Sequence, residues 1–121
     1  MKPVFMCYPK CTTCRKAKKF LEAHEIDFTE RHIVEDNPSA QEILKLMDRY
    51  DGPPRRFFNT SGMVYRERGL KDQVPNMTKE EMAEELATDG MLVKRPQLHL
   101  KDKVLVGFKQ EEWEKALGIE G

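Results

Sequence analysis

The sequence predicts an α/β fold: a mixed four-stranded sheet of the β-α-β … β-β-α kind, with a helical insertion between its second and third strands. At the N-terminus, an apolar run, an amphipathic stretch and an alternating stretch follow one another, as in a β-α-β unit with a right-handed crossover. Near the C-terminus, two short apolar runs flank three charged residues, which is typical of a hairpin. Between these two regions, stretches with helical spacing predict the insertion.

The N-terminal unit is read from three consecutive stretches. Residues 3–8, PVFMCY, form an apolar run that ends at Pro9 and predict a buried strand. Apolar residues then recur at helical spacing and predict a helix from about Thr12 to His24. Residues 27–34, DFTERHIV, alternate in polarity and predict the second strand.

The middle of the chain predicts at least two helices. Asn37-Pro38-Ser39 is a helix start, and Asp51 to Pro54 break that helix. Residues 55–71 give no regular pattern; their expected apolar anchors, around a turn at 59–62, are Phe57, Phe58 and Met63 to Tyr65. Thr78 and Glu81 form a capping box that opens another helix, which stops at Asp89-Gly90.

The C-terminal part predicts the second half of the sheet. Residues 97–100 and 104–108 are apolar runs split by Lys101-Asp102-Lys103, and residues 111–117 predict a last helix. The resulting order of elements is the thioredoxin-like arrangement. In that arrangement the reactive loop joins the first strand to the first helix, which here is the stretch CYPKCTTC.

Length and charge limit the function. A chain of 121 residues is long enough for one core, so we expect a single domain over 1–121. The 21 basic and 21 acidic residues leave no net charge to attract nucleic acid directly, and no apolar run is long enough for a membrane span. With three cysteines and no signal-peptide pattern, we expect a cytoplasmic protein.

The stretch CYPKCTTC fits three kinds of chemistry: an iron–sulfur cluster, a zinc site and a redox-active C-x-x-C pair. The cluster is disfavoured because Cys7 lies in an apolar strand, whereas cluster ligands usually come from one loop. Zinc is disfavoured because a closed site needs four ligands and none of the three histidines lies at ligand spacing. We therefore expect no metal and no bound cofactor, and favour redox chemistry.

The redox interpretation gives each cysteine a role. A helix that begins near Thr12 places Cys11 at its N-cap, where free N–H groups and the helix dipole stabilise a thiolate. The supporting residues that we expect around it are Lys10, Thr12, Thr13 and Arg15. Cys14, one turn further, is the more buried resolving thiol. Cys7 is expected to be an inert core residue; the bland alternative is that the pair is incidental in a reduced protein.

A second feature is predicted to belong to the same site. Arg95-Pro96 precedes the first hairpin strand, where a thioredoxin-like fold usually places a proline beside the reactive cysteine. A cis bond at Pro96 would be a deliberate feature, because few X–Pro bonds are cis. Arg95 is then expected to face the Cys11 thiolate or an oxyanion. Its alternative is an ordinary surface arginine.

The chain resembles the arsenate-reductase-like family of thioredoxin-fold proteins, the group that includes the transcriptional regulator Spx. The segments that carry the resemblance are YPKCTTCRKAKKFLEAHEIDF, FFNTSGMVYRERGL, DGMLVKRP and VLVGF. The resemblance implies that Cys11 is the reactive thiol. In glutaredoxin-dependent members it also implies three arginines that bind the oxyanion, one of which matches Arg95.

The other two arginines of the family pattern are missing. Asn59 stands at one of their positions, and Gly107 and Phe108 stand where the third belongs. Cys14 is a further departure, since arsenate reductases of this type tend to lack a second cysteine. We therefore expect weak or no arsenate reduction, because each charge-assisted donor contributes roughly 1.5–3 kcal/mol.

The sequence thus predicts a cytoplasmic thiol–disulfide oxidoreductase or reductase, with Cys11 as nucleophile and Cys14 as resolving thiol. Its expected partner is a cellular thiol reductant: glutathione with glutaredoxin, or thioredoxin. The alternative is a redox-sensing regulator of the Spx type that binds RNA polymerase and uses the same pair as a switch.

Overall fold

The sheet has the predicted strands and a mixed topology. In the computed structural model, which describes residues 2–119, the four strands are β1 (Val4–Cys7), β2 (Thr29–His32), β3 (Gln97–His99) and β4 (Val104–Val106), in the order β2-β1-β3-β4. β1 is parallel to β2 and antiparallel to β3, and β3 is antiparallel to β4. The crossover helix α1 (Thr12–Ala23) connects the two parallel strands, so the N-terminal unit is the β-α-β unit that the sequence predicts.

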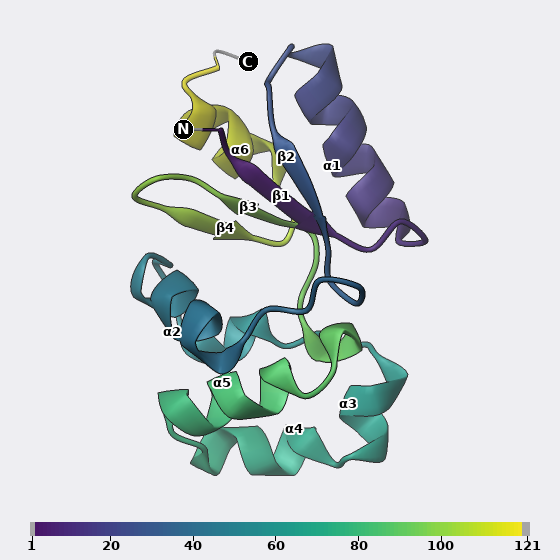
Figure 1. Ribbon diagram of the computed structural model, residues 1–121, viewed down its shortest axis with the longest axis vertical. Coiled ribbons are helices and arrows are strands. Elements are labelled where there is room, and N and C mark those ends of the chain that lie inside the picture. Colours follow the sequence, from purple (N-terminus) through teal and green to yellow (C-terminus); the bar gives the residue numbers. More distant parts are fainter. Residues whose placement is uncertain (1, 120–121) are drawn as a thin grey trace.

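One face of the sheet is covered by α1 and by α6 (Gln110–Leu117), as Figure 1 shows. Side chains that alternate along the strands point to this face, among them Phe5 and Cys7 on β1. Trp113 on α6 is fully buried against Phe5, and its Nε1 donates to the carbonyl oxygen of Gly107 at 3.0 Å. This smaller core lies directly behind the reactive loop.

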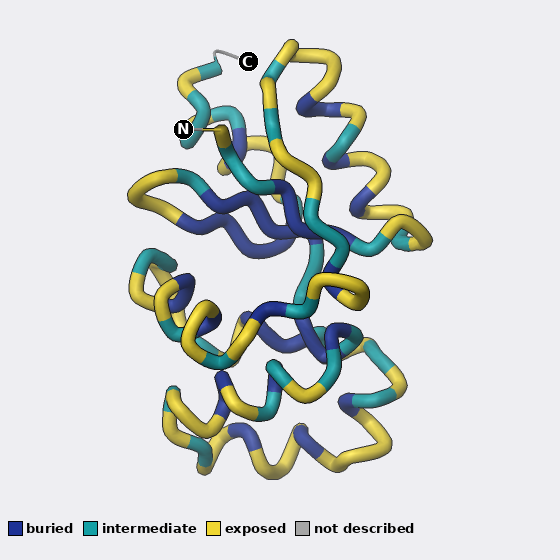
Figure 2. Tube along the Cα trace, in the orientation of Figure 1, coloured by how far each residue is buried: buried dark blue, intermediate teal, exposed yellow. Residues whose placement is uncertain are grey.

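The opposite face is covered by the insertion. It contains α2 (Ala40–Asp48), α3 (Met63–Glu67), α4 (Leu70–Gln73), α5 (Lys79–Ala87) and three short 3₁₀ turns (Pro54–Phe57, Val74–Asn76 and Gly90–Leu92). Met6, which alternates with Phe5 and Cys7, points into this second core. Figure 2 shows buried residues along β1, β3 and β4, with exposed residues mainly on β2, the outer helices and the loops.

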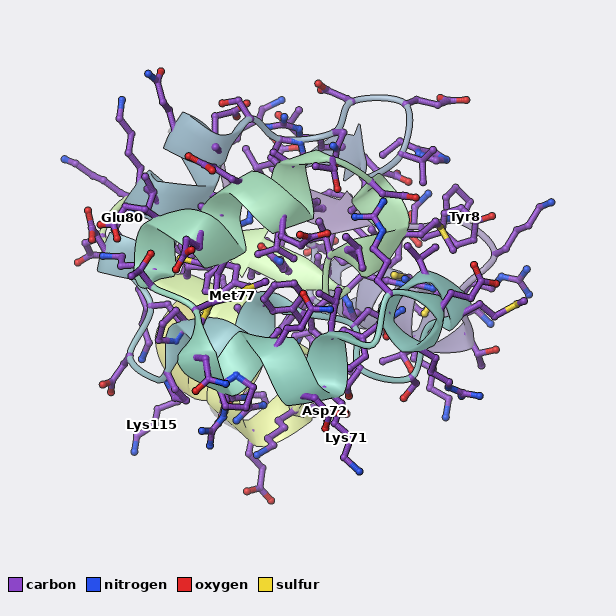
Figure 3. The ribbon with its side chains drawn as sticks, turned by 90° about the horizontal axis from the view of Figure 1, so that it is seen from below. Tyr8, Lys71, Asp72, Met77, Glu80 and Lys115 are labelled. Carbon is purple, nitrogen blue, oxygen red and sulfur yellow. The ribbon has the colours of Figure 1, made fainter. Side chains whose placement is uncertain are left out.

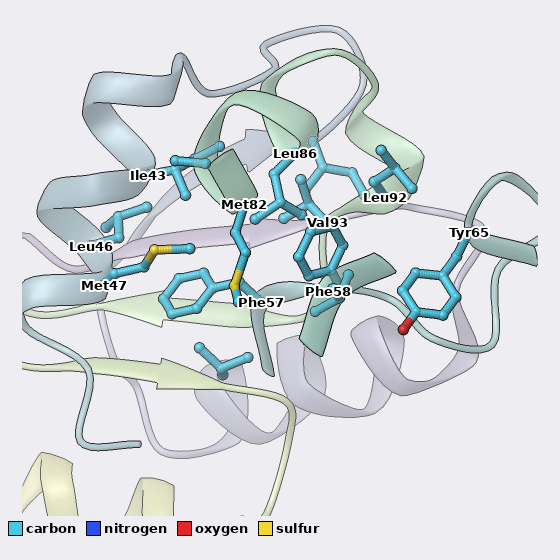
Figure 4. Close-up of a cluster of buried hydrophobic side chains, with 14 of the residues drawn as sticks. Ile43, Leu46, Met47, Phe57, Phe58, Tyr65, Met82, Leu86, Leu92 and Val93 are labelled. Carbon is cyan, nitrogen blue, oxygen red and sulfur yellow. The ribbon is translucent and has the colours of Figure 1, made fainter. Parts of the chain in front are cut away.

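Part of the second core comes from the region that gave no regular pattern in the sequence, residues 55–71. Phe57, Phe58 and Tyr65 are buried there, together with residues of α2 and α5 (Figure 4). The prediction that Met63 is an apolar anchor is wrong, because 72% of this residue is exposed. Met63 opens α3 on its outer side, and Tyr65 takes the anchoring position.

The start and end of most elements match the sequence signals. The Thr78–Glu81 capping box is present at the start of α5, and a second one joins Ser39 and Glu42 at the start of α2. The predicted strand 104–108 is shorter in the structure because Gly107 adopts a φ of 79° and turns the chain after Val106. The predicted strand 27–34 is also longer than β2, which covers Thr29–His32.

Two contacts fix the insertion to the sheet. An added Cβ at Gly90 would lie 2.1 Å from the carbonyl oxygen of Ile33, so only glycine allows this close approach after β2. At the other end, the Arg49 carbonyl accepts a hydrogen bond from the Val104 N–H at 3.1 Å. The Arg49 guanidinium also donates to the Leu100 and Lys101 carbonyls at 2.8 and 3.1 Å.

Candidate active site

Cys11 lies in the loop between β1 and α1. A turn closed by the Cys11 N–H and the Tyr8 carbonyl at 2.9 Å brings the chain into the helix, and Cys11 is its N-cap in an extended conformation. Its thiol is half-buried, whereas the side chains of Thr12 and Thr13 are exposed. Cys11 is therefore the cysteine of the C-x-x-C pair that a substrate can reach.

The surroundings of Cys11 favour its thiolate. Burial raises the pKa of the Cys11 thiol, but interactions with the backbone and side chain of Cys14, the side chain of Arg95 and the backbone of Thr13 lower it, and the net pKa is lowered. The Cys11 side chain forms no cap hydrogen bond of ordinary length. The N–H groups of Thr13 and Cys14 thus act on the sulfur as nearby dipoles at the helix N-terminus.

Arg95 reaches the site from the segment before β3. The Arg95–Pro96 peptide bond is cis. The guanidinium lies 5.4 Å from the centre of the Tyr8 ring, and its Nη1 donates to the Met91 carbonyl at 3.3 Å. Its side chain also interacts with the Cys11 thiol. Cys11 and Arg95 are 84 positions apart in the sequence, but the fold brings the Arg95 side chain to the Cys11 sulfur.

Cys14 is fully enclosed in the first turn of α1. Only 1% of it is exposed, and its Sγ accepts a hydrogen bond from the Tyr8 N–H at 3.3 Å. The neighbouring Cys7 thiol and burial both raise the pKa of Cys14. The Cys14 side chain in turn lowers the pKa of Cys7. Cys14 is thus a protonated, shielded thiol next to the half-buried Cys11.

Cys7 is buried, as expected for a core residue, with 3% exposed. Its contact with Cys14 is not part of the sequence prediction. The C-x-x-C spacing concerns Cys11 and Cys14 alone, while Cys7 comes next to them only because β1 and α1 pack together. The alternation of side chains along β1 was the one signal that could have placed Cys7 on the α1 face.

The remaining predicted residues divide into two groups. Thr13 and Pro96 lie at the site: the Thr13 backbone acts on Cys11, and Pro96 follows Arg95 through the cis bond. Lys10 and Arg15 are exposed and are not among the largest influences on the Cys11 pKa. Arg15 Nε instead donates to the Pro9 carbonyl at 3.2 Å and so holds the loop to the helix.

The residues at the two positions where the family pattern has arginines form other contacts. The Asn59 side chain donates to the Met91 carbonyl at 3.5 Å, the same oxygen that Arg95 contacts, so Asn59 lies beside Arg95. Gly107 forms the turn after β4, and its N–H donates to the Pro96 carbonyl at 2.8 Å. The Phe108 ring packs against Trp113, with 5.0 Å between the ring centres. Uncharged residues therefore stand at the two positions where the family pattern has arginines.

A basic pocket lies near this site, and the sequence did not predict it. The pocket, of about 410 Å³, has four cationic side chains and no acidic one among its lining residues: Arg55, Arg56, Lys71 and Lys94. Lys94 directly precedes Arg95, and an added Cβ at Gly107 would lie 3.6 Å from its Cε. Lys94 thus connects the pocket to the vicinity of the missing third arginine.

The reactive loop lies at one side of the insertion. Figure 3, seen from below, has Tyr8 at one side of the molecule and Glu80 of α5 at the other, with Lys71 and Asp72 of α4 on the lower edge.

Within residues 2–119, no cluster of three or more histidine, cysteine or acidic side chains is arranged to hold a metal ion. Over the same residues, no helix has the length and hydropathy needed to cross a bilayer.

The sheet order, the crossover helix and the cysteine pair at its start define a protein of thioredoxin-like fold, as the sequence predicts. The chain belongs to the ArsC family, whose model matches residues 6–116. It is 48% identical to the uncharacterized protein YusI of Bacillus subtilis over 95% of this chain and 98% of YusI.

Two further proteins show the range of the family. The regulatory protein MgsR of Bacillus subtilis is 31% identical over 89% of this chain and 84% of its own length. The crystal structure of an ArsC-family-related protein from Bacteroides fragilis is 50% identical, with a TM-score of 0.91 over 95% of this chain and 98% of that protein. The chain is thus similar both to a protein named as a regulator and to one named after the ArsC family.

Proposed function

We propose that this protein is a cytoplasmic thiol–disulfide oxidoreductase of the ArsC family, working as one domain over residues 1–121. The observation that carries the proposal is the pairing of a half-buried Cys11, whose pKa is lowered, with a buried Cys14, whose pKa is raised. A nucleophile must be a thiolate that substrates reach, and a resolving thiol must stay protected until the mixed disulfide forms.

The reaction consists of two exchange steps. The Cys11 thiolate attacks one sulfur of a substrate disulfide, so that one substrate thiolate leaves and a mixed disulfide forms. Cys14 then loses its proton and attacks Cys11 Sγ, which releases the second substrate thiolate and leaves a Cys11–Cys14 disulfide. Two electrons pass from the pair to the substrate. A cellular thiol reductant, glutathione with glutaredoxin or thioredoxin, restores both thiols.

Arg95 is proposed to act on the sulfur of Cys11 in both steps. Its fixed positive charge favours the attacking thiolate and also favours Cys11 as the leaving group when the disulfide is reduced. The contacts with the Tyr8 ring and the Met91 carbonyl hold the guanidinium in place. Arg95 therefore needs no rearrangement to serve the reaction.

The test of this proposal is a trapping experiment. In the Cys14→Ser variant, mixed disulfides on Cys11 cannot be resolved and should accumulate, and mass spectrometry identifies the trapped proteins or small thiols. The Cys11→Ser variant is the matched control and should trap nothing. If Cys14→Ser captures no more than this control, Cys11 is not the nucleophile and the proposal fails.

Arsenate is a poor substrate in this proposal. Asn59, Gly107 and Phe108 provide no cation where the family pattern has two arginines. The loss of two charge-assisted donors at roughly 1.5–3 kcal/mol each predicts at least about a hundredfold weaker oxyanion binding. We expect little arsenate turnover with glutaredoxin and glutathione, next to an active arsenate reductase as positive control. Robust turnover would mean that the basic pocket supplies the missing charges.

A redox-sensing regulator of the Spx type is the second candidate, and the 31% identity to the regulatory protein MgsR favours it. In this case the Cys11–Cys14 disulfide would alter binding to RNA polymerase rather than serve turnover. Pull-down of RNA polymerase subunits with oxidised and reduced protein, compared with turnover of a disulfide substrate, distinguishes the two. Redox-dependent capture without turnover would favour the regulator.

A further inference from the structure

Cys7 and Cys14 form a second pair of thiols behind the reactive loop. Cys7 is the last residue of β1, and Cys14 lies in the first turn of α1; both are buried in the core on the α1 side of the sheet. The two side chains lie in the same cluster and line the same small pocket, and each thiol shifts the pKa of the other. Two neighbouring free thiols are one oxidation step away from a disulfide.

The central sulfur of the three is that of Cys14. Both Cys7 and Cys11 influence its pKa, and the Tyr8 N–H donates to it at 3.3 Å. In thiol–disulfide exchange the attacked sulfur must be within reach of both the attacking and the leaving sulfur. Cys14 is the sulfur that neighbours both of the others, as an exchange between Cys7 and Cys11 requires.

The pair is also connected to the surface. Cys7 and Cys14 line a small pocket of about 110 Å³, together with Arg15, Lys18 and Glu30. Lys18 and Glu30 form an ion pair at 2.9 Å, and each side chain is about 40% exposed. The charge of Lys18 favours a Cys7 thiolate and that of Glu30 opposes it. A proton that leaves Cys7 thus has a short polar route to solvent.

We propose that Cys7 is a second redox partner of Cys14, so that the oxidised protein exchanges its Cys11–Cys14 disulfide for a Cys7–Cys14 disulfide. The Cys7 thiolate attacks Cys14 Sγ, the bond between Cys14 and Cys11 breaks, and Cys11 leaves as a thiolate. The oxidation state of the protein does not change, since one S–S bond forms as another breaks. This inference rests on the proposed function, because the Cys11–Cys14 disulfide is its starting point.

In an ordinary oxidised C-x-x-C pair, the reactive cysteine is itself part of the disulfide. After the exchange, the disulfide and the reactive cysteine are separate. The disulfide moves into the core, where only small thiols that enter the pocket beside Lys18 can reduce it directly. At the same time Cys11 is free again as a thiolate at the helix N-terminus. The oxidised protein therefore keeps a reactive thiol and forms mixed disulfides with a second substrate or reductant.

Tryptic peptides distinguish the possible disulfides. Cleavage after Lys10 and Arg15 leaves Cys7 in one peptide and both Cys11 and Cys14 in the next, residues 11–15. A Cys11–Cys14 disulfide therefore stays within one peptide, whereas a disulfide to Cys7 links two. Alkylation of the oxidised protein with iodoacetamide, before digestion without reduction, marks the cysteine that remains free.

The experiment oxidises the protein with diamide under native conditions and maps its disulfides over time. We expect the intrapeptide disulfide first and then linked peptides in which Cys11 carries the label. The Cys11→Ser variant should form the same link directly, and the Cys7→Ala variant should form only the intrapeptide disulfide. The Cys14→Ser variant sets the background for linked peptides.

The outcomes separate this inference from the proposed function. If neither wild type nor Cys11→Ser gives linked peptides above the Cys14→Ser background, the inference is wrong, while the intrapeptide disulfide leaves the proposed function standing. Linked peptides with the label on Cys14 would mean a Cys7–Cys11 bond and would also overturn it. If no intrapeptide disulfide forms but Cys11→Ser gives the link, the proposed function fails and the Cys7–Cys14 pair remains.

Discussion

The buried histidine on β3 predicts a specific pH dependence of stability. Only 8% of His99 is exposed, and its Nε2 lies 2.8 Å from Gln97 Oε1. The Gln97 amide nitrogen donates to the Lys94 carbonyl at 2.9 Å, so its oxygen faces His99 and His99 Nε2 carries the proton. Both the neutral and the charged imidazole carry a proton on Nε2, so it is burial and not this hydrogen bond that disfavours the charged form. Burial, with the charges of Arg49 and Arg31, lowers the His99 pKa to about 4.

The direction of the effect follows from proton binding. Between pH 6.5 and 4, the unfolded chain binds a proton at His99 and the folded protein does not, so the free energy of unfolding falls as the pH falls. A pKa difference from 6.5 to about 4 corresponds to a total loss of about 3 kcal/mol, of which about 2 kcal/mol is reached at pH 5. Above pH 6.5 this contribution is constant.

The measurement is urea unfolding of wild type and His99→Gln at several pH values from 7.5 to about 4.5. The variant loses the network and should be less stable at neutral pH, but the difference should shrink by about 2 kcal/mol near pH 5. His24→Gln, which removes an exposed histidine, is the matched control. If the wild-type and His99→Gln curves run parallel over this range, His99 does not titrate as its surroundings imply and the prediction is refuted.

Three more predictions concern the site, the start of α5 and the core that contains Trp113. Arg95→Ala should raise the pKa of Cys11, measured as alkylation rate against pH, with a nearly unchanged melting temperature, and Arg95→Lys should restore part of the effect; an unchanged profile would make Arg95 ordinary surface charge. Thr78→Ala should lower the free energy of unfolding by about 1 kcal/mol through loss of the capping box, while Thr78→Ser should not. Trp113→Ala should cost about 3–5 kcal/mol in urea unfolding, and a loss below about 1 kcal/mol would contradict its place in the core.

The parts of the fold that the sequence predicted are those in which local pattern and tertiary packing agree. The apolar run at β1 predicts a buried strand, the helical spacing along α1 indicates one buried face, and the capping box at Thr78 marks a helix start by local hydrogen bonds. Residues 54–76 form elements of three to five residues, which are too short for either period to be visible. Their burial depends on contacts with α2 and α5 that no local pattern encodes.

The candidate site shows the same division. The position of Cys11 at a helix N-terminus is a local property, so the sequence reveals it. The contact of Cys14 with Cys7 and the four cations of the basic pocket depend on how distant segments pack. The position of Arg95-Pro96 before the first hairpin strand predicted Arg95 near Cys11, with a surface arginine as the alternative, and the family resemblance added the match to an oxyanion-binding arginine.

The hydrogen bonds of Arg49 have a consequence for how the protein behaves in a crowded solution. β4 is an outer strand of the sheet, and an outer strand with free N–H and carbonyl groups is a template on which another chain can aggregate. At that edge, the Arg49 carbonyl accepts a hydrogen bond from the Val104 N–H. The Arg49 guanidinium donates to the carbonyls of Leu100 and Lys101 at the hairpin turn. The end of α2 therefore blocks strand addition where the sheet is most apolar, and the other outer strand, β2, is protected by its short length and its charged side chains.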